Sequence, residues 1–271
     1  PLALGIMPVG ISEANYGTLD DSRLLPWTNE AIAGLGGEAP IIFKDTEGFD
    51  FEAISDCKPD IILSAFGGMT QEEYEILSEI APTIAYSGEA YQSDWREVIA
   101  KNSRAIGMSA EGQQLITNIE QQVAAEAAKY PKLKGKTAVF GYVNPADLSK
   151  IGFYTPGDQR PSFLRDLGMV TPASWEQLTA QEESFWLEVS AEQADAFDDI
   201  DIIVLYGDDA LLKAMQADPL LGQIPAVQRG SVALITDGSP LAASCSPSAL
   251  SLPWATPEYV KLLAEAADKV G

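Results

Sequence analysis

Histidine is absent from the 271-residue sequence, and this absence removes several classes of functional site. Ser-His-Asp and Cys-His catalysis, histidine-containing zinc sites and histidine-ligated haem all need that side chain. An enzyme would have to rely on carboxylates, lysine, tyrosine, serine or cysteine. We interpret adjacent acidic pairs, such as Glu182 with Glu183 and Asp208 with Asp209, as solvated loop charges. The sequence therefore favours a protein that is not an enzyme.

Basic residues are few, 17 against 40 acidic residues, which gives a net charge of −23. Nucleic acid is therefore excluded as a partner, because binding to phosphates requires a basic surface. Apolar runs of the roughly 18 residues that a membrane helix needs are also missing. The sequence begins at Pro1 without a methionine or a signal peptide, so we expect a processed N-terminus.

Cysteine occurs only twice, at Cys57 and Cys245. Cys57 follows Ile54 by three residues on an apolar helix face, which predicts a buried thiol. A single disulfide in an exported protein is an alternative that this spacing leaves open.

The element around which the chain is organised is a predicted helix over residues 109–130. Apolar residues recur there at four- and three-residue steps, and Pro131 ends the pattern. A helix of this length spans roughly 30 Å. Such a helix between two similar segments indicates a rigid strut between two lobes, with a cleft between the lobes and little hinge motion.

Short apolar runs alternate with helical patterns on both sides of this helix, which predicts parallel sheets covered by helices. The expected fold class is α/β, with two Rossmann-like lobes, each with a mostly parallel sheet, joined by a long rigid helix. We expect an N-terminal lobe over residues 1–94, a connecting helical segment over 95–131 and a C-terminal lobe over 132–271. The predicted strands are 8–11, 40–43, 61–64, 83–86, 137–142, 153–155, 202–206 and 232–235.

The two halves also share a local pattern of landmarks. Glu52 begins a short helix that leads to Asp60 and an apolar strand, and Glu192 does the same before Asp201. The spacing from glutamate to aspartate is eight residues in one half and nine in the other. This order predicts two related lobes.

Aromatic and small residues follow the predicted strands of both lobes. Ligands of open α/β sheets bind beyond the carboxyl ends of the strands, where glycines allow a close approach and aromatic rings offer flat faces. The candidate ligand residues at these ends are Phe66, Met69, Tyr86, Tyr142 and Tyr206.

Several motifs resemble one known family. Residues 51–54, the run Lys58-Pro59-Asp60-Ile61-Ile62-Leu63, and residues 80–83 are similar to the substrate-binding proteins that serve ABC importers of ferric siderophores and vitamin B12. The resemblance covers nearly the whole chain and includes residues 184–192 and 218–227. Family members carry a further strand before the segment at residues 3–6, so the first lobe is expected to be shortened.

The siderophore-binding branch is the more similar one, because residues 154–168 resemble its strand, glycine loop and short helix. That resemblance implies ligand contacts from Tyr154, Arg160 and Trp186. Iron would remain chelated by the siderophore, so neither a cofactor nor a protein metal ligand is expected. Glu79 stands where some siderophore binders carry an arginine, so their contact scheme does not transfer unchanged.

The resemblance also implies that Glu52 and Glu192 dock onto arginines of a membrane permease. The expected function is that of an extracytoplasmic receptor, periplasmic or lipid-anchored, which binds an iron(III)–siderophore complex in the cleft between the lobes and delivers it to an ABC permease. A monomer is expected, and the acidic charge favours hydroxamate or mixed siderophores over anionic catecholates. The alternatives are a corrinoid receptor, a haem receptor with a tyrosine ligand, a carboxylate-based hydrolase and an adhesive protein.

Overall fold

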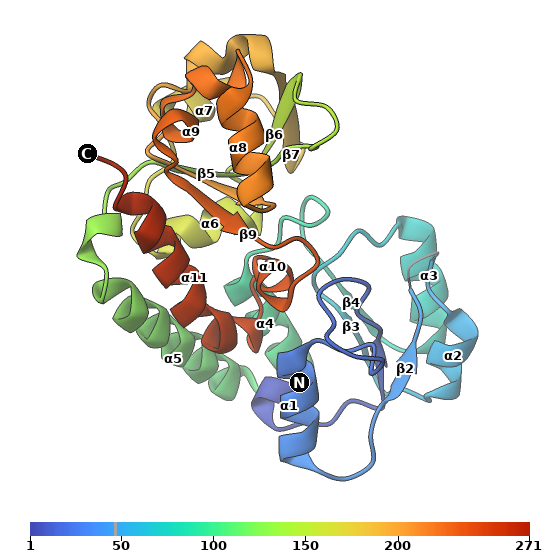
Figure 1. Ribbon diagram of the computed structural model, residues 1–271. Coiled ribbons are helices and arrows are strands. Elements are labelled where there is room, and N and C mark those ends of the chain that lie inside the picture. The colour runs from blue at the N-terminus through green and yellow to red at the C-terminus, as the bar shows by residue number, and fades with distance from the viewer. Residues whose placement is uncertain (46–47) are drawn as a thin grey trace. The chain divides into compact units, whose positions relative to one another are not determined.

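The structure is a computed structural model that describes residues 1–45 and 48–271 (Figure 1). Its residues form two compact units. Unit 1 contains Pro1–Glu120, Gly238–Ala243 and Ser248–Trp254. Unit 2 contains Gln121–Asp237, Ser244–Pro247 and Ala255–Gly271. The chain thus returns to unit 1 near its C-terminal end, which the contiguous division expected from the sequence does not include.

Unit 1 consists of two parallel strand pairs and the helices that follow their strands. Strand β1 (Gly10–Ser12) pairs with β2 (Ile41–Phe43), and β3 (Ile62–Ser64) pairs with β4 (Thr83–Ala85). The helices are α1 (Pro26–Leu35), α2 (Phe51–Asp56), α3 (Gln71–Ile80) and α4 (Trp95–Ala105), with a 3-10 helix at Leu2–Leu4. The predicted alternation of strands and helices is confirmed here.

Short polar side chains fix where these helices begin. Asp50 accepts a hydrogen bond from the backbone of Ala53 at the start of α2, and Asp94 accepts one from Arg96 at the start of α4. Thr70 and Glu73 form a reciprocal capping box at the start of α3. Each cap satisfies a backbone donor that the first turn of a helix leaves without a partner.

The returning segments of the chain attach to unit 1 through aromatic residues. The Tyr16 hydroxyl accepts a hydrogen bond from the backbone of Gly238. Trp27 of α1 packs against Trp254, with ring centroids 5.2 Å apart. These segments belong to α10 (Pro240–Ser244) and α11 (Ser251–Ala267).

The long helix that joins the units is α5 (Ser109–Ala128), which ends two residues before the predicted end. A 3-10 helix at Pro131–Leu133 follows it. Ile116, Ile119 and Val123 are buried, so the apolar stripe expected along this helix is its packed face.

Unit 2 contains a mixed five-stranded sheet in the order β7-β6-β5-β8-β9. Its strands are β5 (Ala138–Tyr142), β6 (Lys150–Tyr154), β7 (Trp186–Ser190), β8 (Ile202–Tyr206) and β9 (Val232–Ile235). The β5-β8 and β8-β9 pairs are parallel, as expected, whereas β5-β6 and β6-β7 are antiparallel. The α/β class is confirmed, with an antiparallel edge that the sequence patterns did not predict.

Alternation along these strands divides the side chains between two faces. One face, with Val139, Phe153 and Leu205, packs against α7 (Ala173–Leu178), α8 (Asp209–Ala217) and α9 (Pro225–Arg229). The opposite face carries Phe140 and lies on the side of α6 (Gln159–Asp166) and α11 (Figure 1). Two 3-10 helices, Ala191–Phe197 and Leu221–Gln223, complete the unit.

Both cysteines are free thiols, Cys57 half-buried and Cys245 buried. Of the helices in the described part of the chain, none combines the length and the apolar character needed to cross a bilayer.

Candidate functional site

Four of the expected ligand residues lie on one face of the unit 2 sheet. Tyr142, Tyr154, Trp186 and Tyr206 alternate with residues of the opposite core, and Trp186 pairs directly with Tyr154 across β6 and β7. Phe140, which is fully buried, lies at the centre of this group. Its ring centroid is 5.7 Å from that of Tyr154 and 5.0 Å from that of Tyr206.

Arg160, in the first turn of α6, reaches this aromatic group and is held in place on two sides. Its Nε donates to the Tyr206 hydroxyl at 3.0 Å, and its Nη1 donates to both oxygens of Asp158 at 3.1 and 2.9 Å. The guanidinium also lies over the Tyr154 ring, 4.1 Å from the centroid. Tyr206 is 8% exposed and Phe140 is fully buried, so the Arg160 guanidinium packs against buried side chains of the sheet.

Asp158 connects this cation to the start of α6. Its side chain accepts from the backbone of Arg160 as the helix cap and forms the ion pair with the Arg160 guanidinium. Burial raises the pKa of the Asp158 carboxyl above its ordinary value, and the Arg160 charge and hydrogen bonds only partly oppose this rise. The ion pair therefore offsets part of the cost of a buried carboxylate.

A glycine determines where the Trp186 ring lies. A Cβ at Gly152 in β6 would fall 1.8 Å from the Cζ2 atom of Trp186, so the indole covers the bare backbone of this residue. The Trp186 ring also meets Tyr154 edge to face at 4.9 Å. Phe185, which is 36% exposed, also stacks on Tyr154, with ring centroids 6.5 Å apart. Trp186 and Phe185 thus both contact Tyr154.

In unit 1, the residues predicted around the ends of β3 and β4 are buried to different degrees. Ser64 and Ala85 are paired, so Phe66 and Tyr86 follow strand ends at the same edge. Both are half-buried. Tyr86 packs against the core cluster that contains Met69, and its hydroxyl donates to the Met69 carbonyl at 3.0 Å. The Met69 side chain is 6% exposed and packs with Ile54 and Leu77, so it contributes to the core.

A lysine that the sequence analysis did not identify also lies at this edge. Lys101 of α4 donates to the Ala85 carbonyl at 3.3 Å and to the Ser87 hydroxyl, and it pairs with Glu97. These bonds fix the segment after β4 against α4.

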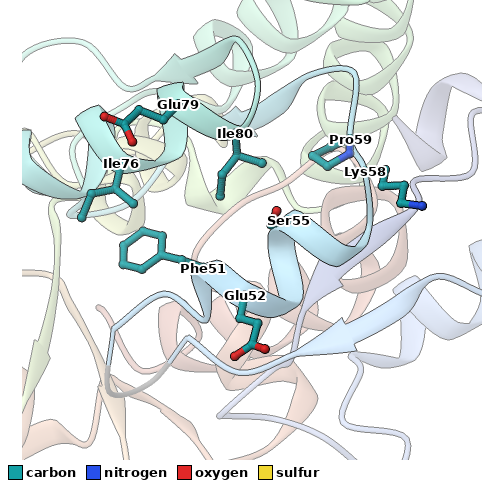
Figure 2. Close-up of a pocket in the computed structure, with 8 residues that line it drawn as sticks. All are labelled: Phe51, Glu52, Ser55, Lys58, Pro59, Ile76, Glu79 and Ile80. Carbon is teal, nitrogen blue, oxygen red and sulfur yellow. The ribbon is translucent and has the colours of Figure 1, made fainter.

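The two glutamates of the expected docking pair occupy equivalent helical positions. Glu52 is the second residue of α2, after Asp50, and Glu192 is the second residue of its 3-10 helix, after Ser190. Both are exposed. Glu52 lines an open groove of about 710 Å³ (Figure 2). Its lining comes from α2, the turn after it and α3, and consists of Phe51, Glu52, Ser55, Lys58, Pro59, Ile76, Glu79 and Ile80.

Glu79 is therefore part of the Glu52 groove, near the C-terminal end of α3. That end of α3 leads into the start of β4 and not to its carboxyl end.

Phe140, Phe185 and Lys101 are not among the residues expected from the sequence, and neither are three further contributors to these surfaces. Asp158 follows a Pro-Gly turn directly before a helix, which is a recognisable capping position. Gly152 interrupts an apolar strand, a pattern that indicates close approach of another group. Tyr91, whose ring meets Phe66 at 6.1 Å, stands in a loop without any local pattern that would have identified it.

Among the residues that the structure describes, no group of three or more Cys, Asp or Glu side chains is arranged to hold a metal ion. The chemistry that the unit 2 surface offers is instead that of a fixed guanidinium donor surrounded by aromatic rings.

Comparison with known proteins gives three informative matches. The chain is 47% identical to PiaA of Streptococcus pneumoniae in a crystal structure with ferrichrome, covering 100% of this chain and 90% of that chain, with a TM-score of 0.94. A second structure of PiaA, described as an iron uptake ABC transporter substrate-binding protein, gives 45% identity over 99% and 89% of the two chains and a TM-score of 0.90.

The siderophore-binding protein FhuD of Vibrio cholerae, bound to Fe3+-Desferal, is 19% identical over 98% and 93% of the chains with a TM-score of 0.64, and shares the fold. No curated protein matches. The family model for periplasmic binding proteins matches residues 2–238, and the chain belongs to this family of binding proteins.

Proposed function

We propose that this protein is the substrate-binding component of an ABC importer for iron, and that it binds a ferric siderophore of the hydroxamate class. The observation that carries the proposal is the 47% identity, along the whole chain, to a protein whose crystal structure contains ferrichrome. The extracytoplasmic location follows from the family. Anchoring by lipid and a monomeric state are further parts of the proposal.

The unit 2 surface has the chemistry that a hydroxamate complex requires. Arg160 uses Nε and Nη1 for Tyr206 and Asp158, whereas its Nη2 donates to no acceptor among the described residues. The Arg160 side chain is 22% exposed, so a ligand oxygen can reach this donor. The oxygens that chelate Fe(III) in a hydroxamate carry partial negative charge and accept such a hydrogen bond.

Aromatic rings supply the remaining contact area on this surface. We propose that Tyr142, Tyr154, Phe185 and Trp186 contact the organic part of the siderophore, and that Tyr206 positions Arg160 from beneath. Aromatic walls with a few fixed polar groups are typical of small-molecule sites. In unit 1 we assign the corresponding role to Phe66 and Tyr86.

Charge favours a hydroxamate over a catecholate. A ferric trihydroxamate is close to neutral, whereas a ferric tris-catecholate carries about three negative charges and is repelled by a chain of net charge −23. A tyrosine-ligated haem is less compatible with the site. Burial raises the pKa of Tyr154 and of Tyr206, which disfavours the tyrosinate that iron would need.

A titration monitored by tryptophan fluorescence tests the ligand class. The panel contains ferrichrome, ferric desferrioxamine B, a ferric tris-catecholate, haemin and cyanocobalamin. We expect ferrichrome to bind at least tenfold more tightly than the catecholate, with no saturable binding of haemin or cyanocobalamin. Tighter binding of the catecholate than of both hydroxamates would overturn the proposed ligand class.

We further propose that Glu52 and Glu192 contact basic residues of the permease. Replacing both, as Glu52→Ala with Glu192→Ala, should abolish uptake of the ferric siderophore and leave its affinity within about twofold of wild type, because neither residue belongs to the aromatic surfaces.

A matched control is the pair Glu72→Ala with Glu176→Ala. These exposed glutamates also lie in first helical turns, one in each unit, and their loss changes the net charge equally. The control pair should transport normally. Uptake that persists in the Glu52/Glu192 variant, or that fails equally in the control, contradicts the docking proposal.

A further inference from the structure

Tyr91 has an unusual backbone conformation for its residue type. Its φ is +63°, in the left-handed region that glycine adopts readily and bulky residues avoid. The segment that carries it, after β4, is irregular, and no helix geometry imposes this conformation. Residues held in such conformations cluster at binding sites, where the surrounding structure maintains the strain.

Three neighbours of Tyr91 come from the turn after β3. The Tyr91 backbone N–H donates to the Gly67 carbonyl at 3.0 Å. Its ring lies on Gly68, where an added Cβ would fall 2.6 Å from the ring carbon Cε2 and from the hydroxyl oxygen. The ring also meets Phe66 nearly perpendicularly, at 78°. One short turn thus fixes both the backbone and the side chain of this residue.

These contacts leave much of the ring accessible, since Tyr91 remains 46% exposed. Packing alone does not account for a strained tyrosine that leaves nearly half of its surface exposed. The exposed ring stands beside Phe66, at the edge where the parallel strands β3 and β4 end. In an open α/β unit this edge is where ligands bind.

We propose that Tyr91 is a ligand-binding residue of unit 1, and that Gly68 is the positioning residue that allows its ring to lie in place. This inference rests on the proposed function and assigns the ring to the organic part of a ferric hydroxamate siderophore. Flat aromatic faces suit such contacts, because they offer area at a small cost in side-chain entropy.

The test measures affinity for ferrichrome in Tyr91→Gly. Glycine accepts the left-handed backbone without strain, so this substitution removes the ring and retains the loop. We expect at least a tenfold loss of affinity, with no decrease in the melting temperature of the ligand-free protein. Affinity equal to that of wild type would overturn the inference.

Gly68→Ala tests the positioning role. Gly68 does not have a positive φ, and the three atoms nearest to an added Cβ all belong to the Tyr91 side chain. We expect a fivefold or greater loss of affinity, and no further loss when Gly68→Ala is added to Tyr91→Gly. Equal losses in both backgrounds would show that Gly68 acts independently of Tyr91.

Gly34→Ala is the matched control, because Gly34 is exposed in α1 and an added Cβ meets nothing within 4 Å. Its affinity should equal that of wild type. If wild type binds neither ferrichrome nor ferric desferrioxamine B, the proposed function fails together with this inference. If wild type binds and the Tyr91 and Gly68 variants bind equally well, only the inference fails.

Discussion

In each unit an exposed or half-exposed aromatic ring lies on a glycine, but the two rings are supported differently. In unit 2, Trp186 covers Gly152, a buried residue in the middle of β6 with a strand paired on each side. In unit 1, Tyr91 covers Gly68, an exposed residue in the turn after β3, which pairs with β4 over three residues only. The first ring depends on a sheet and the second on a loop.

The same contrast extends to the polar groups. Arg160 and Asp158 are fixed by charge, hydrogen bonds and buried rings, whereas Lys101 in unit 1 ties backbone segments together. We infer that unit 2 presents a preorganised polar surface and that unit 1 presents aromatic contacts whose positions depend on local loop geometry. Preorganisation reduces the entropy lost on binding.

Of the substitutions that test this contrast, Arg160→Ala should have the largest effect on stability and binding. It leaves the carboxyl of Asp158, 1% exposed, without its cation. We expect a loss of about 3 kcal/mol in the free energy of unfolding, and loss of ferrichrome binding. Urea unfolding measures the first. Arg165→Ala, which removes only an exposed hydrogen bond to the Pro156 carbonyl, should cost less than about 0.5 kcal/mol.

The cost of Arg160→Ala should depend on pH in a defined direction. The pKa of Asp158 is already raised by burial, and loss of Arg160 raises it further. In the variant, the folded protein then binds a proton at Asp158 more readily than the unfolded chain does. The contribution of this carboxyl to stability is therefore greatest at acidic pH and falls as pH rises through its folded-state pKa. The deficit should therefore be smaller at pH 4 than at pH 7; an equal or larger deficit at pH 4 contradicts this role of the ion pair.

A smaller effect is expected from Gly152→Ala, which tests whether the sheet really fixes Trp186. The new methyl group overlaps the indole, and overpacking of this kind costs about 1–3 kcal/mol. Thermal unfolding and the tryptophan emission spectrum should both change. In a Trp186→Ala background the same substitution should cost almost nothing, and a full cost there would mean that other neighbours of Gly152 are responsible.

Tyr206→Phe should have a lesser effect again. It removes the hydroxyl that accepts a hydrogen bond from Arg160 Nε, and we expect the free energy of unfolding to fall by about 1–2 kcal/mol. Ferrichrome binding should weaken severalfold, because the guanidinium is held by fewer hydrogen bonds. The control is Tyr130→Phe, since the Tyr130 hydroxyl has no hydrogen bond to the described residues. Identical behaviour of the two variants would remove Tyr206 from the positioning network.

The smallest expected effect is a difference in thiol reactivity between Cys57 in unit 1 and Cys245 in unit 2. Burial raises the pKa of Cys245 in unit 2 to about 12, and burial followed by the Asp56 charge raises that of Cys57 in unit 1. At pH 8 a thiol reagent should label half-buried Cys57 slowly and spare Cys245, while the unfolded chain reacts at both. The variant Cys57→Ser should lose the native reaction. Rapid labelling of Cys245 in the native protein would contradict this expectation and show that the unit 2 core opens readily.

Much of the fold was predictable because its signals are local. The strands of unit 1 and the connecting helix follow from apolar periodicity and from turn residues such as Pro131. The segment at residues 186–190 was not predicted as a strand, because an edge strand that pairs antiparallel with β6 depends on a partner distant in sequence. The return of the chain to unit 1 likewise depends on long-range contacts.

The candidate sites divide in the same way. Arg160 and Trp186 were reached through resemblance, and the structure brings them together around Tyr154. Met69 was assigned to the strand-end surface on position alone, and its side chain lies in the core. Tyr91 could not be identified, because its exposure and its left-handed backbone are properties of the folded loop and not of any sequence pattern.

The return of residues 238–243 and 248–254 has a consequence for how this protein can be divided. A fragment that stops at Glu120 would lack Trp254, leaving one side of Trp27 open to water. The amino-terminal half is therefore not a self-sufficient module that recombination could transfer intact. During synthesis its final packing must wait until the ribosome has translated most of the other half.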